Sequence, residues 1–269
     1  EKETSFAKVL NSEGYETCVV DKWMLCYDFE DHPNTFKEAG FNKHYMWRLW
    51  DTSIPLDERV TPNIPITSGY WNPAIWENGP VDVGKGEYGP DLFCDYLIDF
   101  IKRNNNKPFL AYWPMHLIHR ETYHGKTTPP TPLTVSEYPD KTGKTIDKQK
   151  GTADMIFYMD KLIGRLVSTL DSLKLREKTL IVFTGDNGTS FEILSHWNDT
   201  IIRGGKRDLT EAGCRVPLIA NWPGVLPNGK VEEQLVDFTD FFPTFAEISG
   251  ATIPQNLTID GYNFLSKSL

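Results

Sequence analysis

The sequence predicts an α/β fold built on a mostly parallel, mixed β-sheet that helices cover on both faces. Two observations lead to this prediction. Short apolar runs alternate along the chain with longer segments in which apolar residues recur every three or four positions. The short runs are continuously apolar, as expected of strands whose two faces are both buried.

The first half of the chain contains two predicted helix–strand pairs. A helix is expected at residues 5–13, and Gly14 ends it because glycine readily takes the left-handed conformation found after helices. The short apolar run at 16–20 is the first strand. Residues 90–103 carry their apolar side chains at helical spacing, and a strand is predicted at 108–113.

The second half continues the alternation. The strongest helical pattern covers residues 153–175, where one apolar stripe contains Met155, Met159, Leu162, Leu166, Leu170 and Leu173. Buried strands are predicted at 179–183 and 216–222, and a last helix at 239–249. Strands separated by helices in this way are typical of a single α/β layer structure.

Two long, proline-rich connections interrupt these elements, at 42–88 and 120–150. Long loops in a compact domain are usually functional lids or disordered segments. The first connection holds half of the tryptophans, and burial under a lid is the favoured interpretation over stacking on sugars. No repeat or low-complexity tract divides the chain, so residues 1–269 are predicted to form a single catalytic domain.

Composition excludes several classes of protein. A net charge of -9 argues against a nucleic-acid binder, although a few lysines in a cleft can still attract a small anion. No apolar run approaches the roughly 18 residues that a membrane span needs, so no membrane partner is expected. The four cysteines are scattered and lack the spacing of a zinc site.

Polar side chains follow three of the predicted strands. Lys22 comes just after the first strand, His116 and His119 follow the second, and Asp186 and Asn187 follow the third. Ligands of parallel α/β sheets bind beyond the carboxyl ends of the strands. Asp and Asn offer hard oxygen atoms that suit Ca²⁺ or Mg²⁺. A lysine and a neutral histidine suit the binding of an oxyanion and the protonation of a leaving group.

Each of these residues also has a structural interpretation. Asp-Asn-Gly is a common turn sequence, and a single lysine is usually solvated. A histidine beside an aromatic strand is more often a packed, hydrogen-bonded residue than a catalyst. Their coincidence at successive strand ends favours a functional site.

Five segments occur in the order and with the spacing of one enzyme family. They are YETCVVDKWMLC (15–26), KPFLAYWPMHLIHR (107–120), DKLIGRLVSTLDSLKLREKTLIVFTGDNGT (160–189), RGGKRDLTEAGCRVPLIANWPG (203–224) and VDFTDFFPTFAEISGATIP (236–254). Together they resemble the sulfatases, in particular arylsulfatase-like members of the alkaline-phosphatase superfamily. The resemblance implies an alkaline-phosphatase-like α/β sandwich, of which this chain is a central and incomplete part.

The resemblance assigns roles to the matching residues one by one. Lys22 and Lys206 resemble the two sulfate-binding lysines, and His119 resembles the histidine that contacts the leaving oxygen of the ester; these three are the expected catalytic residues. Asp186 and Asn187 resemble the calcium ligands of the family's Asp-Asn-Gly loop.

Three further residues lie close to these in the matching segments. His116 precedes His119 by three residues and is expected to line the substrate pocket. Glu211 and Arg215 belong to the motif around Lys206, where a supporting salt bridge is the expected role.

The sequence also departs from the family pattern. No Cys/Ser-x-Pro-x-Arg motif, the precursor of the formylglycine nucleophile, occurs in these 269 residues, and the family's paired metal-binding aspartates have no counterpart. We therefore expect the chain to lack the nucleophile segment and the C-terminal subdomain, and to be inactive alone. Asp21 and Ala212 stand where the family has glycine, and Met24 where it has histidine.

The resemblance implies hydrolysis of a sulfate ester, either a saccharide sulfate or another small organic sulfate. The implied cofactors are Ca²⁺, with Mg²⁺ as the alternative, and formylglycine in the full-length protein. The family resemblance also implies a periplasmic, extracellular or lysosomal location. Two alternatives stay open: a metal-dependent phosphoester or phosphonate hydrolase of the same superfamily, and a catalytically inactive truncated homologue.

Overall fold

The computed structural model describes residues 3–26, 28–51, 66–121 and 127–265. The chain forms two compact units, one made of residues 1–116 and 227–269 and the other of residues 117–226. Helices and strands occur in both units, which confirms the predicted α/β class. The assignment of all 269 residues to one catalytic domain stays a prediction, and each unit is described by itself.

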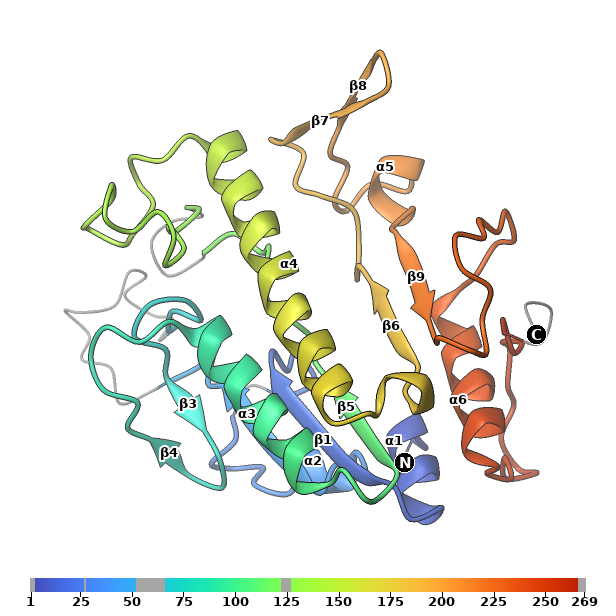
Figure 1. Ribbon diagram of the computed structural model, residues 1–269. Helices are drawn as coiled ribbons and strands as arrows, with labels where there is room; N and C mark the ends of the chain where they lie inside the picture. Colours follow the sequence, from blue (N-terminus) through green and yellow to red (C-terminus); the bar gives the residue numbers. More distant parts are fainter. Residues whose placement is uncertain (1–2, 27, 52–65, 122–126, 266–269) are drawn as a thin grey trace. The chain divides into compact units, whose positions relative to one another are not determined.

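The first unit contains a five-stranded mixed sheet in the order β4-β3-β2-β1-β5 (Figure 1). Its strands are β1 (Glu16–Asp21), β2 (Lys43–Trp47), β3 (Ile75–Trp76), β4 (Pro80–Val81) and β5 (Phe109–Tyr112). The central strand β1 pairs in parallel with β2 and β5, whereas β3 and β4 are antiparallel to their neighbours. The 42–88 segment is therefore not a plain connection, because three of the five strands lie within it.

Helices cover both faces of this sheet. On β2, the Tyr45 ring stacks on Tyr96 of α3 (Gly89–Arg103) with ring centroids 4.5 Å apart. The neighbouring His44 points to the other face and stacks on Phe36 of α2 (Thr35–Glu38) at 4.3 Å. Successive strand residues face opposite sides of a sheet, so both faces of β2 are buried, as the continuous apolar runs predicted.

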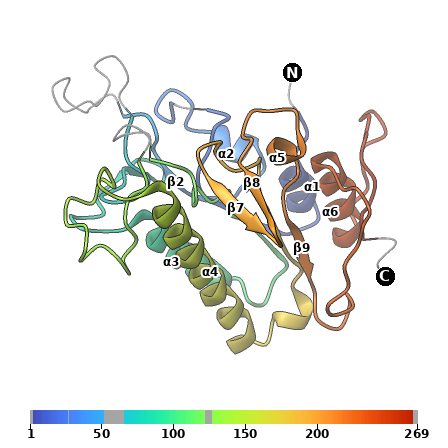
Figure 2. The ribbon, with the colours of Figure 1, turned by 90° about the horizontal axis from the view of Figure 1, so that it is seen from above.

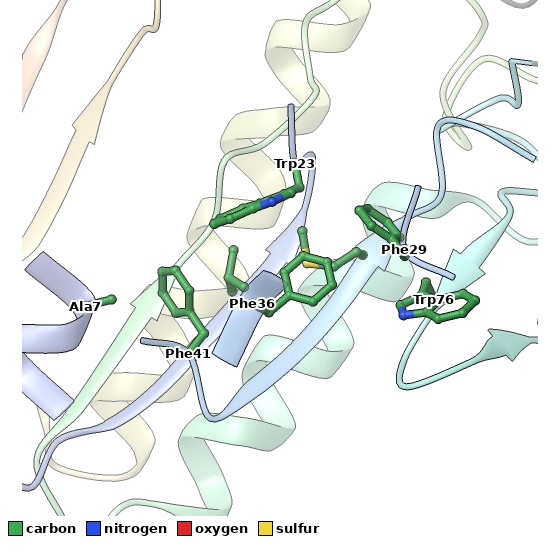
Figure 3. Close-up of a cluster of buried hydrophobic side chains, with 8 residues drawn as sticks. Ala7, Trp23, Phe29, Phe36, Phe41 and Trp76 are labelled. Atoms are coloured by element: carbon green, nitrogen blue, oxygen red, sulfur yellow. The ribbon is translucent and has the colours of Figure 1, made fainter. Parts of the chain in front are cut away.

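A largely aromatic cluster fills the space between the sheet and α2 (Figure 3). Its buried members are Ala7, Val19, Trp23, Phe29, Phe36, Phe41, Met46 and Trp76. The rings meet mostly edge to face, as in the Trp23–Phe36 and Phe29–Phe36 pairs at 5.4 and 5.0 Å. Helix α1 (Phe6–Ser12) contributes Ala7 to the cluster, and α1 also packs against α6 (Phe241–Ser249), which follows the short 3₁₀ helix η3 (Phe238–Asp240).

The second unit is built around α4 (Lys148–Ser172). This helix starts five residues before the predicted 153, because the Asp147 side chain accepts hydrogen bonds from the backbone N–H groups of Gln149 and Lys150. The glycine inside its first turns, Gly151, allows close approach of Thr128, whose Oγ1 lies 2.4 Å from where a Cβ would be. No helix in the described ranges is both long and apolar enough to cross a membrane.

Two antiparallel strand pairs complete the second unit. After the 3₁₀ helix η2 (Arg176–Lys178), strand β6 (Ile181–Thr184) pairs with β9 (Leu218–Asn221). Strand β7 (Leu194–Trp197) forms a hairpin with β8 (Thr200–Arg203), and the short helix α5 (Glu211–Cys214) precedes β9. The hairpin and α5 are seen next to each other in Figure 2.

The packing of His44 generates a prediction about stability and pH. Burial, together with the charge of Lys43, lowers the pKa of His44 from 6.5 to about 4. The imidazole Nε2 accepts a hydrogen bond from the Asn78 N–H at 3.3 Å, as a neutral ring can. The unfolded chain therefore binds a proton between pH 6.5 and 4 that the folded chain does not, and stability that is present above pH 6.5 falls toward pH 4.

We expect wild type to lose about 1–2 kcal/mol more unfolding free energy than His44→Gln between pH 7.5 and 5. Urea unfolding of both proteins at the two pH values measures this difference. The glutamine keeps an acceptor for Asn78 and does not titrate, so other groups cancel in the comparison. Equal losses in the two proteins would show that folding does not lower the pKa of His44.

Candidate active site

The last residue of β1 is a buried carboxylate. Asp21 is fully buried and has a φ of 86°, a conformation that glycine takes more easily. Its Oδ1 lies 2.6 Å from Nδ1 of His116, and its Oδ2 accepts hydrogen bonds from Trp113 Nε1 at 2.9 Å and from the His116 N–H at 3.1 Å. A carboxylate accepts hydrogen bonds, so a hydrogen on Nδ1 would complete this contact. The pair joins the end of β1 to the segment after β5.

His116 is enclosed by aromatic rings. The ring centroids of Trp47, Tyr70 and Phe93 lie 5.4, 4.4 and 5.9 Å from the imidazole. Only 2% of His116 is exposed, and within the described residues its Nε2 has no hydrogen-bond partner. A side chain at Gly69 would place its Cβ 3.0 Å from Nε2. This burial favours the packed, hydrogen-bonded role for His116 over the pocket-lining role.

Lys22 follows Asp21 at the carboxyl end of β1, as the sequence predicted. Its backbone N–H donates to the Pro114 carbonyl at 3.3 Å, so it lies beside the segment that contains His116. The side chain is half-buried. Met24, which stands in place of the family's histidine, is 45% exposed, and it adds no hydrogen-bonding group beyond a weak thioether acceptor.

In the second unit, the loop after β6 presents the predicted metal ligands. Asp186 is exposed and Asn187 is half-buried. The next residue is held in place, because Gly188 N–H donates to the Gly213 carbonyl at 2.8 Å. A Cβ at Gly188 would lie 1.9 Å from the Ala212 carbonyl oxygen, so only glycine fits there. The backbone is thus held in place at Gly188, the residue that follows Asp186 and Asn187.

The loop that carries Lys206 is bonded to the same segment. Lys206 N–H donates to the Thr189 carbonyl at 2.9 Å, and Gly205 N–H donates to the Ala212 carbonyl at 3.2 Å. The second unit therefore brings the loop of Asp186 and Asn187 together with the loop of Lys206. The predicted ion pair of the matching motif is present as well, with Arg215 Nη1 3.3 Å from Glu211 Oε2, on exposed side chains.

His119 is exposed, and the next residue, Arg120, pairs with a carboxylate that lies between the loop of Asp186 and the β7–β8 hairpin in the sequence. Arg120 forms an ion pair with Glu192, and Lys148 at the start of α4 lies 2.8 Å from the other oxygen of that carboxylate. Partial burial lowers the pKa of Arg120. Sequence reasoning missed this cluster, because Glu192 lies 72 residues after Arg120 and no local pattern marks the pair.

The donors present fit part of a calcium site. Ca²⁺ takes roughly six to eight oxygen ligands, and Asp186 and Asn187 offer carboxylate and amide oxygens on one short loop. Within the described ranges no group of three or more His, Cys, Asp and Glu side chains is placed to hold a metal ion. These two residues would therefore supply a minority of the ligands of any bound calcium.

The structure thus groups the predicted residues in two sets. Lys22 and His116 belong to the first unit, and His119, Asp186, Asn187 and Lys206 belong to the second. Metal-assisted hydrolases of anionic esters typically use lysine, histidine and oxygen donors. In an α/β fold these residues lie on loops that follow the strands.

Comparison with known proteins identifies the family. The sulfatase family model matches residues 1–251, so the chain belongs to the sulfatase family. N-acetylgalactosamine-6-sulfatase of Canis lupus familiaris is 29% identical over 279 residues, covering 100% of this chain and 49% of that protein. Steryl-sulfatase of Rattus norvegicus is 32% identical over 328 residues, covering 98% of this chain and 54% of that protein.

Solved structures show the same relationship. The crystal structure of Ps i-CgsB in complex with k-i-k-neocarrahexaose matches with a TM-score of 0.70 and 25% identity, over 96% of this chain and 56% of that chain. Its fold is that of the alkaline-phosphatase-like sulfatases, which confirms the predicted fold class. The chain spans about half the length of the curated relatives it matches.

The Asp21–His116 pair generates a stability prediction. Asp21→Gly relaxes a left-handed backbone but leaves three donors, two of them on the buried His116, without their acceptor, so we expect the unfolding free energy to fall by about 3 kcal/mol. His116→Leu should also destabilise, and the double variant should cost about 1–3 kcal/mol less than the sum of the single variants. Urea unfolding of the four proteins measures this coupling.

Asn78→Gly is the matched control, because Asn78 is exposed and also has a positive φ, 56°. It should change stability by no more than about 0.5 kcal/mol. An Asp21→Gly variant as stable as wild type would show that the pair does not hold β1 to the segment after β5.

The partial calcium site generates a second prediction. With one carboxylate and one amide from the protein, water must complete the shell, and we expect a Ca²⁺ dissociation constant on the order of 1 mM. Isothermal titration calorimetry of the 269-residue chain measures it, with Asp186→Ala as the control that should abolish binding. Micromolar binding that Asp186→Ala leaves intact would place the ion elsewhere.

Proposed function

We propose that this chain supplies the sulfate-binding and leaving-group side of an active site that hydrolyses sulfate esters of saccharides. Membership of the sulfatase family supports the reaction class. The observation that carries the proposal is the hydrogen bonding between the loop of Asp186 and Asn187 and the loop of Lys206. Oxygen ligands for a cation and a lysine for an anion thereby lie on two loops that are hydrogen-bonded to the same segments.

Each residue has a distinct task in this proposal. Lys22 and Lys206 donate hydrogen bonds to the sulfate oxygens and offset their negative charge. His119 donates a proton to the ester oxygen as the alcohol departs. Asp186 and Asn187 hold Ca²⁺, with Mg²⁺ as the alternative, and the bound cation would further neutralise the sulfate. The buried Asp21–His116 pair sets the backbone position of Lys22, because Asp21 directly precedes it.

A saccharide substrate is favoured by the relatives. The name of one relative specifies a sulfated amino sugar, and a similar solved structure carries a neocarrahexaose. Another relative is named for sterol sulfates, so the family also accepts esters of other alcohols. The family resemblance is the support for formylglycine as the nucleophile of a full-length protein and for a periplasmic, extracellular or lysosomal location.

A binding experiment tests the proposed function on the chain itself. In the presence of Ca²⁺, N-acetylgalactosamine 6-sulfate should bind the 269-residue chain, as followed by amide NMR shifts. Lys22→Ala and Lys206→Ala should each weaken binding by about tenfold or more, because a charged hydrogen bond contributes roughly 1.5–3 kcal/mol.

Lys102→Ala is the matched control for loss of one positive charge. Lys102 is exposed in the last turn of α3, and the chain continues from there to the start of β5, at the opposite end of the sheet from Lys22. It should leave the affinity within about twofold. Binding that is insensitive to both Lys22→Ala and Lys206→Ala would contradict the proposed function.

A further inference from the structure

The β7–β8 hairpin exposes large apolar side chains within the second unit. Four residue pairs form it, from Leu194↔Arg203 at its base to Trp197↔Thr200 next to its turn. Asn198 makes the turn possible by taking a left-handed φ of 53°. Figure 1 shows the two strands extending beyond α5 and β6. Trp197 is 68% exposed, which is unusual for a tryptophan.

The base of this hairpin is fastened to the two loops of the candidate site. Gly204 N–H donates to the Ile193 carbonyl at 2.9 Å, just outside the last strand pair. Two residues after Gly204, Lys206 N–H donates to the carbonyl of Thr189, which follows the loop of Asp186. Gly204 has no room for a side chain, because its Cβ would lie 2.2 Å from the Ser190 carbonyl. The hairpin therefore continues directly into the loop of Lys206, which is hydrogen-bonded to the residue that follows the loop of Asp186.

The tip of the hairpin has the chemistry of a sugar platform. Opposite residues of an antiparallel pair share a face, so Trp197 lies with Ser195, Thr200 and Ile202, and Ile201 lies on the other face. Exposed hydrogen-bonding residues are next to Trp197 in the sequence, including Asn198 and Asp199 in the turn. A flat apolar ring bordered by polar groups suits one face of a pyranose ring, which is apolar in its centre and hydroxylated at its edge.

Cationic side chains on the same segment suit an anionic saccharide. Arg203, Lys206 and Arg207 lie within five residues of each other, and both arginines are exposed. Asp199 and Asp208 flank them, so the segment carries no large net positive charge. Each cation can still donate a charge-assisted hydrogen bond to a sulfate group of the saccharide.

The distance from base to tip sets the length of the ligand. Trp197 is four residues beyond Ile193, a rise of about 13 Å at roughly 3.4 Å per residue. A single pyranose ring is much shorter than this span. A monosaccharide held at Lys206 therefore cannot reach the indole, whereas an oligosaccharide can.

From these contacts we propose that Trp197 is a specificity residue that stacks on a sugar ring of a sulfated oligosaccharide, distal to the ring whose sulfate is cleaved. This inference rests on the proposed function. It assigns the hairpin to the recognition of chain length, and it gives Trp197 no part in the chemical step.

Two probes test the inference on the 269-residue chain with Ca²⁺, N-acetylgalactosamine 6-sulfate as the monosaccharide and k-i-k-neocarrahexaose as the longer ligand. Trp197→Ala should weaken hexasaccharide binding about three- to tenfold, the range of one aromatic stacking contact. It should change monosaccharide binding less than about twofold, and Trp197→Phe should keep part of the hexasaccharide affinity. The hexasaccharide should also shift the indole N–H signal that is lost in Trp197→Phe.

Ile201→Ala is the matched control, because it removes an exposed apolar side chain from the opposite face of the same hairpin. If Lys206→Ala weakens both ligands but Trp197→Ala weakens neither, the inference is wrong and the proposed function stands. If neither Lys22→Ala nor Lys206→Ala weakens the binding of either ligand, both the inference and the proposed function are wrong. A dimer that Trp197→Ala dissociates, with saccharide affinities unchanged, would make the hairpin a self-association surface and overturn the inference.

Discussion

Close backbone contact between the loop after β6 and the residues around α5 is the constraint on which the second unit depends. Gly188, Gly205 and Gly213 meet at this contact, and a Cβ on any of them would lie within 3 Å of a neighbouring atom. The hydrogen bonds that result hold Asp186, Asn187 and Lys206 on one support. The family's Glu-Gly-Gly becomes Glu-Ala-Gly here without loss of this contact, because the closely packed position is Gly213 and that glycine is retained.

In the first unit, side-chain hydrogen bonds rather than glycine contacts fix the backbone next to the candidate lysine. The family has a glycine before the first lysine, and this chain has Asp21 at that position, in a left-handed conformation. Backbone strain of this kind is offset only when surrounding contacts determine the conformation. Three hydrogen bonds to His116 and Trp113 provide those contacts. His116 is the hydrogen-bond partner of Asp21, its role in lining the substrate pocket stays a prediction, and Lys22 directly follows the carboxylate of this pair.

Much of the secondary structure could be predicted from the sequence, because amphipathic spacing is a local signal. The predicted helix at 90–103 is α3 (Gly89–Arg103), and the strand at 179–183 overlaps β6 (Ile181–Thr184). The strand β2 was missed, because prolines and tryptophans nearby suggested a loop across 42–88. The β7–β8 hairpin was missed too, although Asn198-Asp199 between apolar runs is a recognisable turn signal.

The site was only partly predictable, for a physical reason. Residues beyond strand ends are marked by local sequence, so Lys22, Asp186 and Asn187 were found where the structure places them, at the ends of β1 and β6. Side-chain pairs between residues that are distant in the sequence produce no local sequence pattern. Asp21 and His116 are 95 residues apart, and Arg120 and Glu192 are paired from different segments. The antiparallel pairing of β6 with β9 likewise depends on tertiary packing rather than on either strand's own sequence.

In the proposed function, His119 and Lys206 of the second unit serve a sulfate beside a cation held by Asp186. Paramagnetic broadening of amide NMR signals by Mn²⁺ in place of Ca²⁺ tests this arrangement, because broadening depends steeply on distance from the ion. We expect broadening at His119 and Lys206 that disappears in Asp186→Ala. Sharp Lys206 signals beside broadened signals around Asp186 would contradict the proposed function, as would broadening that persists in Asp186→Ala.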